Sequence, residues 1–517
     1  MSDVAHPAAK PVPNKWLVAF VVSLATFMEV LDTTITNVSL RHIAGSLGAG
    51  QEESTWVLTS YLVANGIILP LSGWLSDVLG RKRFFIICIL GFTIASFACG
   101  AATSLIGLVI FRIIQGAAGG GLQPTQQAII LDSFPPKERG AVFTITGLTM
   151  IVAPVLGPTL GGVITDNIDW RWIFYINIPV GLVAAFFVWR LVEDPPHAKA
   201  KGFRQIDFVG LGLVSLGLAA LQIVLDKGQT EDWFSSGFIQ IWSLTSFTCL
   251  TIAAIWLWKR AEPIVDLSLL TNRAFLSSCI LIFLTGFVLY SSSALLPLML
   301  QTEYGYNATW AGFILSPGAL CVIFFMPLVG KMVSKVQARY LIAIGLTLCS
   351  VGMFATMGFT PQTDFHTFVI FRILQVIGLP FLFIPISALA FANIEKERSN
   401  KASALFSLSR NLGGSIGIAI AQAFISHGQQ VHRHFLSEHL VPGSQNYERL
   451  LSQTQKVIPD AHSAMGHINQ TLQQQANILA YSDTFELMGI LMAGALVISL
   501  CVLPANKPGG SPTSGGH

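Results

Sequence analysis

The chain has 517 residues, of which 52% are hydrophobic and only 11% are charged. Soluble globular proteins carry about 25% charged residues on average, so this composition excludes an ordinary soluble protein. The formal net charge of +3 is too small to indicate a nucleic-acid partner.

Apolar segments long enough to cross a membrane follow one another from Trp16 to Leu503. A helical membrane span needs about 20 residues. The sequence predicts fourteen spans, at 16–40, 54–75, 84–103, 105–130, 141–165, 170–192, 208–226, 236–259, 275–300, 308–332, 340–359, 366–391, 402–425 and 483–503. The alternating polarity of outer-membrane barrel strands is absent, so we expect an all-α integral membrane protein.

Two of these spans carry an arginine within nearly the same string, VIFRIIQ around Arg112 and VIFRILQ around Arg372. A charged side chain at membrane depth costs about 2.5–3.5 kcal/mol on insertion scales, so its repetition indicates a duplicated bundle in which the arginine has a task. We therefore expect two six-helix bundles, at 16–192 and 275–503, with two inserted transmembrane helices at 208–259. Residues 1–15 are expected to form a cytoplasmic tail, and the Gly- and Pro-rich residues 504–517 a disordered one.

The turns between the predicted spans differ in charge from one side to the other. Lys and Arg gather on the side of the N-terminus, which predicts that both termini lie in the cytoplasm. The one long outer segment, 426–482, is rich in Gln, and we expect it to be polar and loop-like apart from a helix at 464–481. His432 and His434 could hold a metal there, but a solvated loop is the favoured interpretation. The seven cysteines fall in predicted spans without ligand spacing, so no metal site is expected.

The turn between the second and third spans reads GWLSDVLGRKR over residues 73–83. A basic cluster that holds the turn in the cytoplasm would explain part of this string. The whole string resembles the loop 2–3 motif of the major facilitator superfamily, in which an acid and the first base form a latch that breaks as two halves rock. The resemblance assigns this role to Asp77 and Arg81, with Asp132 at the end of the fourth span. The corresponding turn of the second half, residues 330–335, lacks the acid.

The fifth span contains the string APVLGPTLGG, in which Pro154 and Pro158 are the prolines. Gly157 and Gly161 are four residues apart and lie on one helix face, where they permit close packing of another helix. Pro158 removes a backbone donor and favours a kink. Packing alone would explain both glycines. The string that ends at Gly162 nevertheless resembles the antiporter motif of the same superfamily, which favours export over import.

The first span carries two acids, Glu29 and Asp32, which are three residues apart and are expected to share one helix face. A carboxyl group balanced between burial and a nearby arginine can bind and release protons near neutral pH. We expect Asp32, with Glu29, to handle the coupling proton and Arg112 to be the partner; a structural ion pair with Arg112 is the alternative. The string LDTTITNV from Leu31 resembles the first-span motif of fourteen-helix drug:proton antiporters, and it departs from that motif after Val38.

Further polar residues at membrane depth are candidates for a substrate cavity walled also by Phe and Met side chains. These candidates are Gln115, Gln123, Gln126, Gln127, Tyr290, Arg372, Gln375, Arg410 and Asn411. Any of them could instead form an interhelical hydrogen bond, which is worth about 0.6 kcal/mol on average. The span 275–300 offers Arg372 no deep acid, so we expect proton handling in the first half and a structural or substrate-facing role for Arg372.

Four other strings extend the resemblance over nearly the whole chain: DKG at 226–228, DWFSS at 232–236, PIVDL at 263–267 and YGYNATWAG at 304–312. They are similar to strings in the inner-membrane subunits of tripartite multidrug pumps of the same antiporter family. The resemblance implies a bacterial inner-membrane location, a periplasmic membrane-fusion adaptor and a TolC-like outer-membrane channel as partners, and lipophilic small molecules as substrates.

The combined interpretation is a proton-coupled multidrug efflux antiporter that works by alternating access. The proton motive force drives it, and we expect no cofactor and no enzyme activity, since a nucleotide-binding Gly-Lys-Ser/Thr loop is absent. The alternatives are an exporter of one lipophilic substrate such as a fatty acid, a nutrient importer, and a membrane sensor or scaffold with a transporter fold.

Overall fold

The computed structural model describes residues 14–135, 138–194, 207–260, 263–392, 394–438, 440 and 443–502. Within these ranges the regular structure is entirely helical. The expected C-terminal tail and all but the last two residues of the expected N-terminal tail lie outside the described residues.

The helices follow the predicted spans in order, and three spans, 105–130, 170–192 and 366–391, are each made of two shorter helices. The first half contains α1 (Lys15–Leu47), α2 (Gln51–Ser54), α3 (Trp56–Leu79), α4 (Arg81–Gly100), α5 (Leu105–Gly119), α6 (Leu122–Ser133), α7 (Arg139–Asn167), α8 (Trp172–Tyr175) and α9 (Asn177–Leu191). The inserted pair is α10 (Phe208–Lys227) and α11 (Gly237–Lys259), with the 3₁₀ turns η3 (Trp233–Ser235) and η4 (Leu267–Thr271). The second half contains α12 (Arg273–Thr302), α13 (Ala308–Met332), α14 (Ala338–Phe354), η5 (Ala355–Gly358), α15 (Phe365–Ile377), α16 (Leu379–Ala390), η6 (Lys396–Arg398), α17 (Ser399–Glu438), α18 (Gln445–Gln455) and α19 (Ala461–Val502).

Several spans begin where a polar side chain caps the first helical turn. Asn14 accepts a hydrogen bond from the backbone N–H of Trp16 at the start of α1, and Asn307 accepts one from Trp310 at the start of α13. The first backbone N–H groups of a helix have no intrahelical acceptor, so a side-chain oxygen at this position stabilises the helix start. These caps lie just before the apolar runs, which is why the runs and the helices begin together.

Thirteen of the described helical segments are long and apolar enough to cross a membrane. The remaining expected span, 402–425, lies within α17. This helix is more polar than the others because it carries Arg410 and Asn411 at depth and continues into the polar residues after Ile425. The chain is therefore an all-α membrane protein in which fourteen spans are arranged as two six-helix bundles and two inserted helices.

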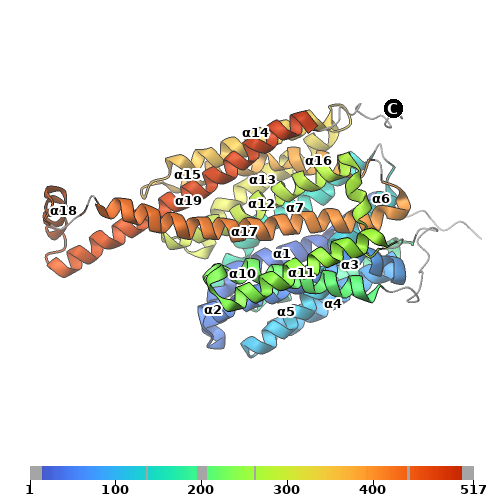
Figure 1. Cartoon of the computed structure of the whole chain (residues 1–517), viewed down its shortest axis with the longest axis horizontal. Coiled ribbons are helices and arrows are strands. Elements are labelled where there is room, and N and C mark those ends of the chain that lie inside the picture. The colour runs from blue at the N-terminus through green and yellow to red at the C-terminus, as the bar shows by residue number, and fades with distance from the viewer. Residues whose placement is uncertain are drawn as a thin grey trace, which may run out of the picture.

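The duplication is visible in the packing of the helices (Figure 1). In the first half α1 packs on α7, and in the second half the equivalent α12 packs on α17. Across the two halves α7 packs on α13, and the equivalent pair in the other direction is α17 on α3. The inserted helix α10 packs on α11, on α3 and on α17, so it lies where the two halves meet.

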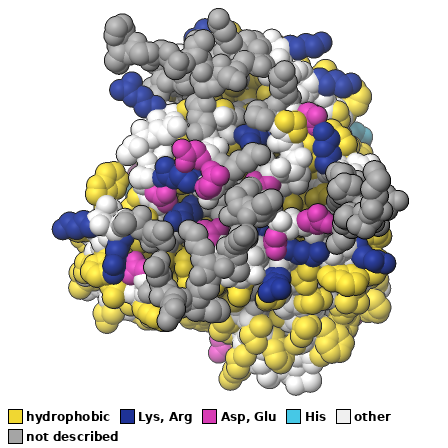
Figure 2. Space-filling view, turned by 90° about the vertical axis from the view of Figure 1, so that its right-hand side faces the viewer, with side chains coloured by type: hydrophobic (Ala, Val, Ile, Leu, Met, Phe, Trp, Pro, Cys, Tyr) yellow, Lys and Arg dark blue, Asp and Glu magenta, His cyan; other side chains and the backbone are white. Residues whose placement is uncertain are grey.

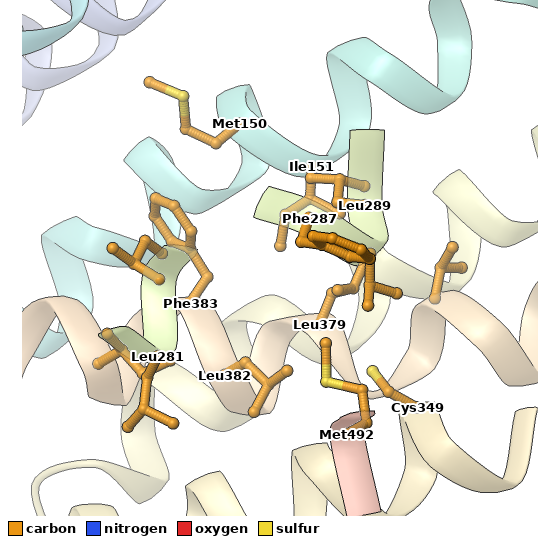
Figure 3. Close-up of a cluster of buried hydrophobic side chains, with 14 of the residues drawn as sticks. Met150, Ile151, Leu281, Phe287, Leu289, Cys349, Leu379, Leu382, Phe383 and Met492 are labelled. Atoms are coloured by element: carbon orange, nitrogen blue, oxygen red, sulfur yellow. The ribbon is translucent and has the colours of Figure 1, made fainter. Parts of the chain in front are cut away.

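The apolar core joins the halves as well as filling them. One large cluster runs from α7 into the second bundle, and Figure 3 shows part of it, with Ile151 of α7 beside Phe287 and Leu289 of α12. Two smaller clusters fill the first bundle on their own. The second half and α7 therefore form one continuous core.

The two ends of the bundle differ in character. Helix α1 begins and α19 finishes at one end, which we call the terminal end, and α18 lies beyond the opposite end, which we call the distal end (Figure 1). On the terminal end, Lys, Arg, Asp and Glu side chains are spread over the face and reach its edge in places, while hydrophobic side chains are concentrated along its lower margin (Figure 2). This is the arrangement expected where a membrane surrounds the bundle and water covers its end.

The expected helix at 464–481 is confirmed as part of α19, but the expectation that the rest of 426–482 is loop-like is wrong for most of its length. Helix α17 continues to Glu438, α18 follows, and α19 already begins at Ala461, so that a helical hairpin projects at the distal end (Figure 1). The extensions are polar but packed: Ala464 and Ile468 are buried, and Nε2 of His432 lies 2.6 Å from Oδ2 of Asp483. A search for apolar runs finds membrane spans but does not find polar helices that continue beyond them.

Candidate transport site

Asp32 lies wholly inside the first bundle and is held by three side chains. Nη1 of Arg112 donates to Oδ2 of Asp32 at 2.5 Å, and the amides of Gln115 and Asn177 donate to Oδ1 at 2.9 and 2.8 Å. Asp32 and Arg112 are both completely buried. Nη1 of Arg112 also donates to Oε1 of Gln115 at 2.8 Å, as their three-residue spacing on α5 suggests. A buried carboxylate and guanidinium in this geometry neutralise each other and fix the positions of α1, α5 and α9.

Glu29 is one turn earlier on α1, but its carboxylate points into a different group of residues. Its Oε1 accepts from the hydroxyl of Tyr61 and the amide of Asn65, each at 3.2 Å, and its Oε2 accepts from Nε2 of Gln123 at 2.7 Å. Oε1 of Gln123 in turn accepts from Nη2 of Arg410 on α17. Gln123 therefore links an acid of the first half to a base of the second half. Glu29 and Asp32 are three residues apart on the continuous helix α1, as expected for a shared face, but their carboxylates bond to different groups.

Tyr61 connects the two acidic clusters. Its hydroxyl donates to Glu29, while its ring lies 4.2 Å from the guanidinium carbon of Arg112. A cation over an aromatic face is attracted by about 2 kcal/mol when both groups are removed from water. Any movement of Tyr61 therefore changes the surroundings of both carboxylates.

A cavity of about 410 Å³ lies between the two bundles and includes Glu29 in its wall. Side chains of α1, α3, α6, α7, α10, α12 and α17 line it. It extends from Glu29 and Gln123 to the distal end, where Thr230 is exposed. This volume is that of a site for a drug-sized molecule.

The cavity differs from the expected one in which residues line it. Among the candidates, Gln123, Tyr290 and Asn411 line it. The other six, Gln115, Gln126, Gln127, Arg372, Gln375 and Arg410, are buried but do not line it. The expected Phe and Met wall is also wrong for the described residues, which supply mainly Leu, Thr, Asn and Gln with two tyrosines. Polar residues within apolar spans were correctly predicted to lie at depth. Whether each one faces the cavity depends on how the helices pack, which the sequence pattern does not show.

The inserted helix α10 contributes to the wall of the cavity. The sequence analysis did not predict this role. Leu218, Gln222, Leu225 and Asp226 of α10 line it, and Thr230 follows them. The residues 218, 222, 226 and 230 are spaced by four, which places helical residues on one face. Polar residues at this spacing on an otherwise apolar span are the signal that would have revealed this wall.

Arg372 of the second half has no acidic partner among the residues that touch it. Its guanidinium donates to Oγ of Ser293 at 3.1 Å, to Oγ of Ser292 at 3.4 Å and to Oε1 of Gln375. It is completely buried. The equivalent arginines therefore lie in different surroundings, an ion pair in the first half and a neutral polar cluster in the second.

The latch residues lie together at the terminal end and reach across to the second half. Arg81 forms an ion pair with Asp132 and donates to Oγ of Ser399 on α17 at 3.2 Å. Nδ2 of Asn400 donates to Oδ1 of Asp77 at 2.5 Å. These contacts, together with the close packing of α3 on α17, close the terminal end between the halves.

A related contact closes the other crossing point at the same end. Nη1 of Arg139 on α7 donates to the carbonyl oxygen of Phe391 at 2.7 Å. A Cβ atom on Gly73 would lie 3.2 Å from the backbone oxygen of Asn400, and one on Gly330 would meet Thr144 of α7. In each half, a glycine near the end of the second span thus contacts the fifth span of the other half: Gly73 of α3 lies against α17, and Gly330 of α13 lies against α7.

The charged turn of the second half contacts the segment that follows the inserted helices. Nη2 of Arg398 lies 2.6 Å from Oδ2 of Asp266, and the hydroxyl of Ser268 donates to Oδ1 of Asp266 at 2.6 Å. Burial acts to raise the pKa of Asp266, but the hydrogen bonds from Ser268 and Arg398 and the charges of Arg398 and Lys401 outweigh it, so this pKa is lower than usual. The string PIVDL thus anchors the inserted pair to the second bundle.

The glycines of the fifth span serve two different contacts. Cβ atoms on Gly157 and Gly161 would collide with Thr34 and Ile35 of α1. A Cβ atom on Gly162 would lie 2.6 Å from the carbonyl oxygen of Ala308 on α13. Pro154 and Pro158 lie inside the same helix, and both are buried. The motif therefore lets α7 approach α1 within its own half and α13 across the halves.

These features match known transporters over nearly the whole chain. Residues 22–418 match the family model described as Major Facilitator Superfamily. The chain is 35% identical over 502 residues to the multidrug export protein EmrB of Escherichia coli K12, which covers 96% of this chain and 97% of that protein. It is also 35% identical over 514 residues to the fatty acid resistance protein FarB of Neisseria gonorrhoeae, covering 99% of this chain and 100% of that protein.

A solved structure shares the fold at much lower identity. The proton:xylose symporter XylE is 14% identical and superposes with a TM-score of 0.63, covering 96% of this chain and 97% of that one. The likeness concerns the fold alone. Together with the family match and the relatives at 35% identity, it leads to one conclusion: this chain belongs to the major facilitator superfamily.

Proposed function

We propose that the chain exports lipophilic compounds across a bacterial inner membrane in exchange for protons, by alternating access of the cavity between its two halves. One observation carries the proposal. Glu29 lines the cavity and is linked through Gln123 to Arg410 of the second half. A proton that arrives at Glu29 acts on the contact that must change when the halves rock. The names of the relatives, multidrug export and fatty acid resistance, support lipophilic compounds as substrates.

The direction of access follows from the two ends of the bundle. The Lys and Arg distribution of the turns supports placing the terminal end and both termini in the cytoplasm. The closed contacts of Arg81, Asp132 and Asn400 then lie on the cytoplasmic side, and the cavity opens to the periplasm. In this arrangement substrate leaves the cavity and a proton enters it.

The proton step begins at Glu29 and is transmitted to Asp32. Protonation removes the negative charge of Glu29, which weakens its bond with Gln123 and its indirect attraction to Arg410. It also weakens the bond from Tyr61, whose ring rests on Arg112, the partner of Asp32. A ligand shifts an equilibrium between two states only by its different affinity for them, and one proton crossing 100 mV supplies about 2.3 kcal/mol.

With the distal end in the periplasm, the hairpin beyond this end lies where periplasmic partners could contact it. The hairpin of α17, α18 and α19 projects at the distal end, which the proposal places in the periplasm (Figure 1). We propose that a periplasmic membrane-fusion adaptor of the EmrA type and a TolC-like outer-membrane channel carry the exported compound onward. The proton motive force is the sole source of energy in this proposal, which includes no cofactor and no enzyme activity.

The test is transport by the purified protein in liposomes with an imposed pH gradient. We expect Glu29→Gln and Asp32→Asn each to abolish substrate movement against its gradient, while downhill exchange persists in Glu29→Gln. The matched control is Asp232→Asn, since Asp232 is exposed between α10 and α11. Its backbone φ is +52°, a conformation that Asn adopts readily, so the control should behave as the wild type. Coupled transport that is undiminished in both acid variants would contradict the proposal.

A further inference from the structure

We propose that α10 is a substrate-binding wall of the cavity and that Asp226 on it binds the cationic group of a lipophilic cation near the distal opening. This inference rests on the proposed export function and specifies its substrate class. It concerns a helix of the inserted pair, to which neither the fold nor the coupling of protons assigns a role.

The position of α10 carries the first step. This helix packs on α3 of the first half and on α17 of the second. These two helices cross at the terminal end, where Gly73 approaches the backbone of Asn400. Towards the distal end the space beside them is closed by α10, whose Leu218, Gln222 and Asp226 line the cavity. Without α10 this side of the cavity would face the surrounding lipid.

The contacts on the opposite side of α10 explain why the face with Gln222 and Asp226 lies towards the cavity. The hydroxyl of Ser246 on α11 donates to the carbonyl oxygen of Gly217 at 3.1 Å. A Cβ atom on Gly217 would lie 2.7 Å from Leu250 of α11. The absence of a side chain at this glycine therefore allows α11 to seat closely, and this contact turns the stripe of Gln222 and Asp226 towards the cavity.

The charge of the lining determines the class of substrate. Of the described residues that line the cavity, the charged ones are Glu29 and Asp226, both acidic. Arg410 is buried beyond Gln123 and does not line the cavity. Lys227, the neighbour of Asp226, does not line the cavity either, but its Nζ is 2.5 Å from Oγ1 of Thr55, which does line it, and its charge acts on the Asp226 carboxylate. Two acids in the wall against this one base leave the cavity net negative, so it favours a lipophilic cation over a carboxylate. Of the relatives' names, the inference therefore follows multidrug export rather than fatty acid resistance.

The carboxylate of Asp226 is held ready for such a ligand. Oγ1 of Thr59 donates to its Oδ2, which fixes the side chain against α3. The side chain is half-buried, so its charge is only partly screened by water. Leu218 and Leu225 on the same helix, with Leu58 and Leu62 on α3, supply apolar surface for the body of the ligand.

Glu29 and Asp226 then serve different purposes along the cavity. Glu29 is at the closed end, where it contacts groups that connect the two halves. Asp226 is at the end of α10 towards the distal opening. Its hydrogen bond from Thr59 ties it to α3 of the first half, and none of the contacts described above links it to the second half. Neutralising Asp226 should therefore weaken substrate binding without removing proton coupling.

The test uses two ions of similar size and opposite charge, tetraphenylphosphonium and tetraphenylborate. Their equilibrium binding is measured with the full chain in lipid nanodiscs. We expect the wild type to prefer the cation, and Asp226→Asn to weaken cation binding about tenfold, the usual effect of losing one charged partner. Binding of tetraphenylborate should not weaken. Asp232→Asn, six residues further along the chain and outside the cavity, should bind both ions as the wild type does.

A second measurement tests whether α10 lines the binding site, with a variant that leaves the charge of Asp226 in place. Gln222→Cys should react with a water-soluble maleimide from the distal side, and tetraphenylphosphonium should slow this reaction. Ser235→Cys is the control, because Ser235 is exposed in the turn between α10 and α11 and does not line the cavity, so the maleimide should label it and the cation should not protect it.

The outcomes separate this inference from the proposed function. Unchanged cation binding in Asp226→Asn, preference of the wild type for tetraphenylborate, or an unprotected Gln222→Cys would each overturn the inference. Absence of proton-coupled transport in a wild-type protein that binds the cation through Asp226 would instead overturn the proposed function and leave the binding wall in place.

Discussion

Removal of the charge on Asp32 should be among the most destabilising conservative changes in this protein. Asp32→Asn keeps the size of the side chain, and its amide oxygen can still accept from Asn177. The Asp32 carboxylate lies 2.5 Å from Nη1 of Arg112, and both side chains are completely buried. After the substitution Arg112 retains the carbonyl oxygen of Val57 at 3.1 Å and Oε1 of Gln115 at 2.8 Å, but no charge opposes its own within this cluster.

The magnitude follows from the distance and the burial. Two unit charges 2.5 Å apart attract by about 7 kcal/mol at an effective dielectric constant of about 20. The desolvation of both groups offsets much of this attraction in the intact pair, but in Asp32→Asn the desolvation of Arg112 remains and the attraction is lost. Breaking a buried pair in this way costs about 3–5 kcal/mol. In the double variant Asp32→Asn/Arg112→Gln neither charge is buried alone, so the loss should be smaller than the sum of the two single losses by about 1–3 kcal/mol.

Thermal unfolding followed with a thiol-reactive dye measures this prediction. Cys88, Cys99, Cys279 and Cys349 are buried thiols without a disulfide partner, so the dye reacts as the protein unfolds. Both single variants should unfold at clearly lower temperature than the wild type and than Asp232→Asn, and the double variant should lose less than the sum. Equal unfolding temperatures for Asp32→Asn and wild type, or strictly additive losses, would refute the reasoning that this pair is dry and coupled.

Three further predictions follow from other contacts. Gly162→Ala should destabilise the protein by about 1–3 kcal/mol and reduce transport, because the added carbon meets the α13 backbone; Gly494→Ala, with open space around it, should do neither. Asn400→Ala removes a contact that closes the terminal end, so a cysteine placed at the buried Ser407 should react faster with thiol reagents, and an unchanged rate would contradict the proposed gate. Asp266 has a lowered pKa, so its stabilising contribution is complete above its ordinary pKa and is lost as the pH falls below about 4. Thermal unfolding of Asp266→Asn should therefore depend less on pH in this range than that of the wild type.

The clusters around Glu29 and Asp32 show what the spacing of residues along a helix can predict and what it cannot. The three-residue spacing of Arg112 and Gln115 was sufficient to predict that both reach the same side of α5. The same spacing of Glu29 and Asp32 suggested one shared site, whereas the carboxylates belong to two clusters joined by Tyr61. Residues three apart on a helix are offset by about 60° around its axis and by about 4.5 Å along it. Which groups each carboxylate meets therefore depends on the helices that pack around α1.

The inserted helices show the same limit for whole elements. Their number and position followed from hydropathy. That α10 contributes Gln222 and Asp226 to the cavity depends on its contacts with α3 and α17, which lie far away in sequence. Conversely, the polar part of α17 beyond Ile425 and the helix α18 were missed, because they lack the apolar runs on which the prediction relied.

The sequence by itself determined the membrane spans, the duplication, the family motifs and the buried charges, because each of these depends on local composition or on spacing within one helix. The tertiary structure decided which carboxylate faces the cavity, which glycines join the two halves and which end of the bundle is closed. These properties depend on contacts between helices separated by a hundred residues or more, and the pattern within a single span does not contain them.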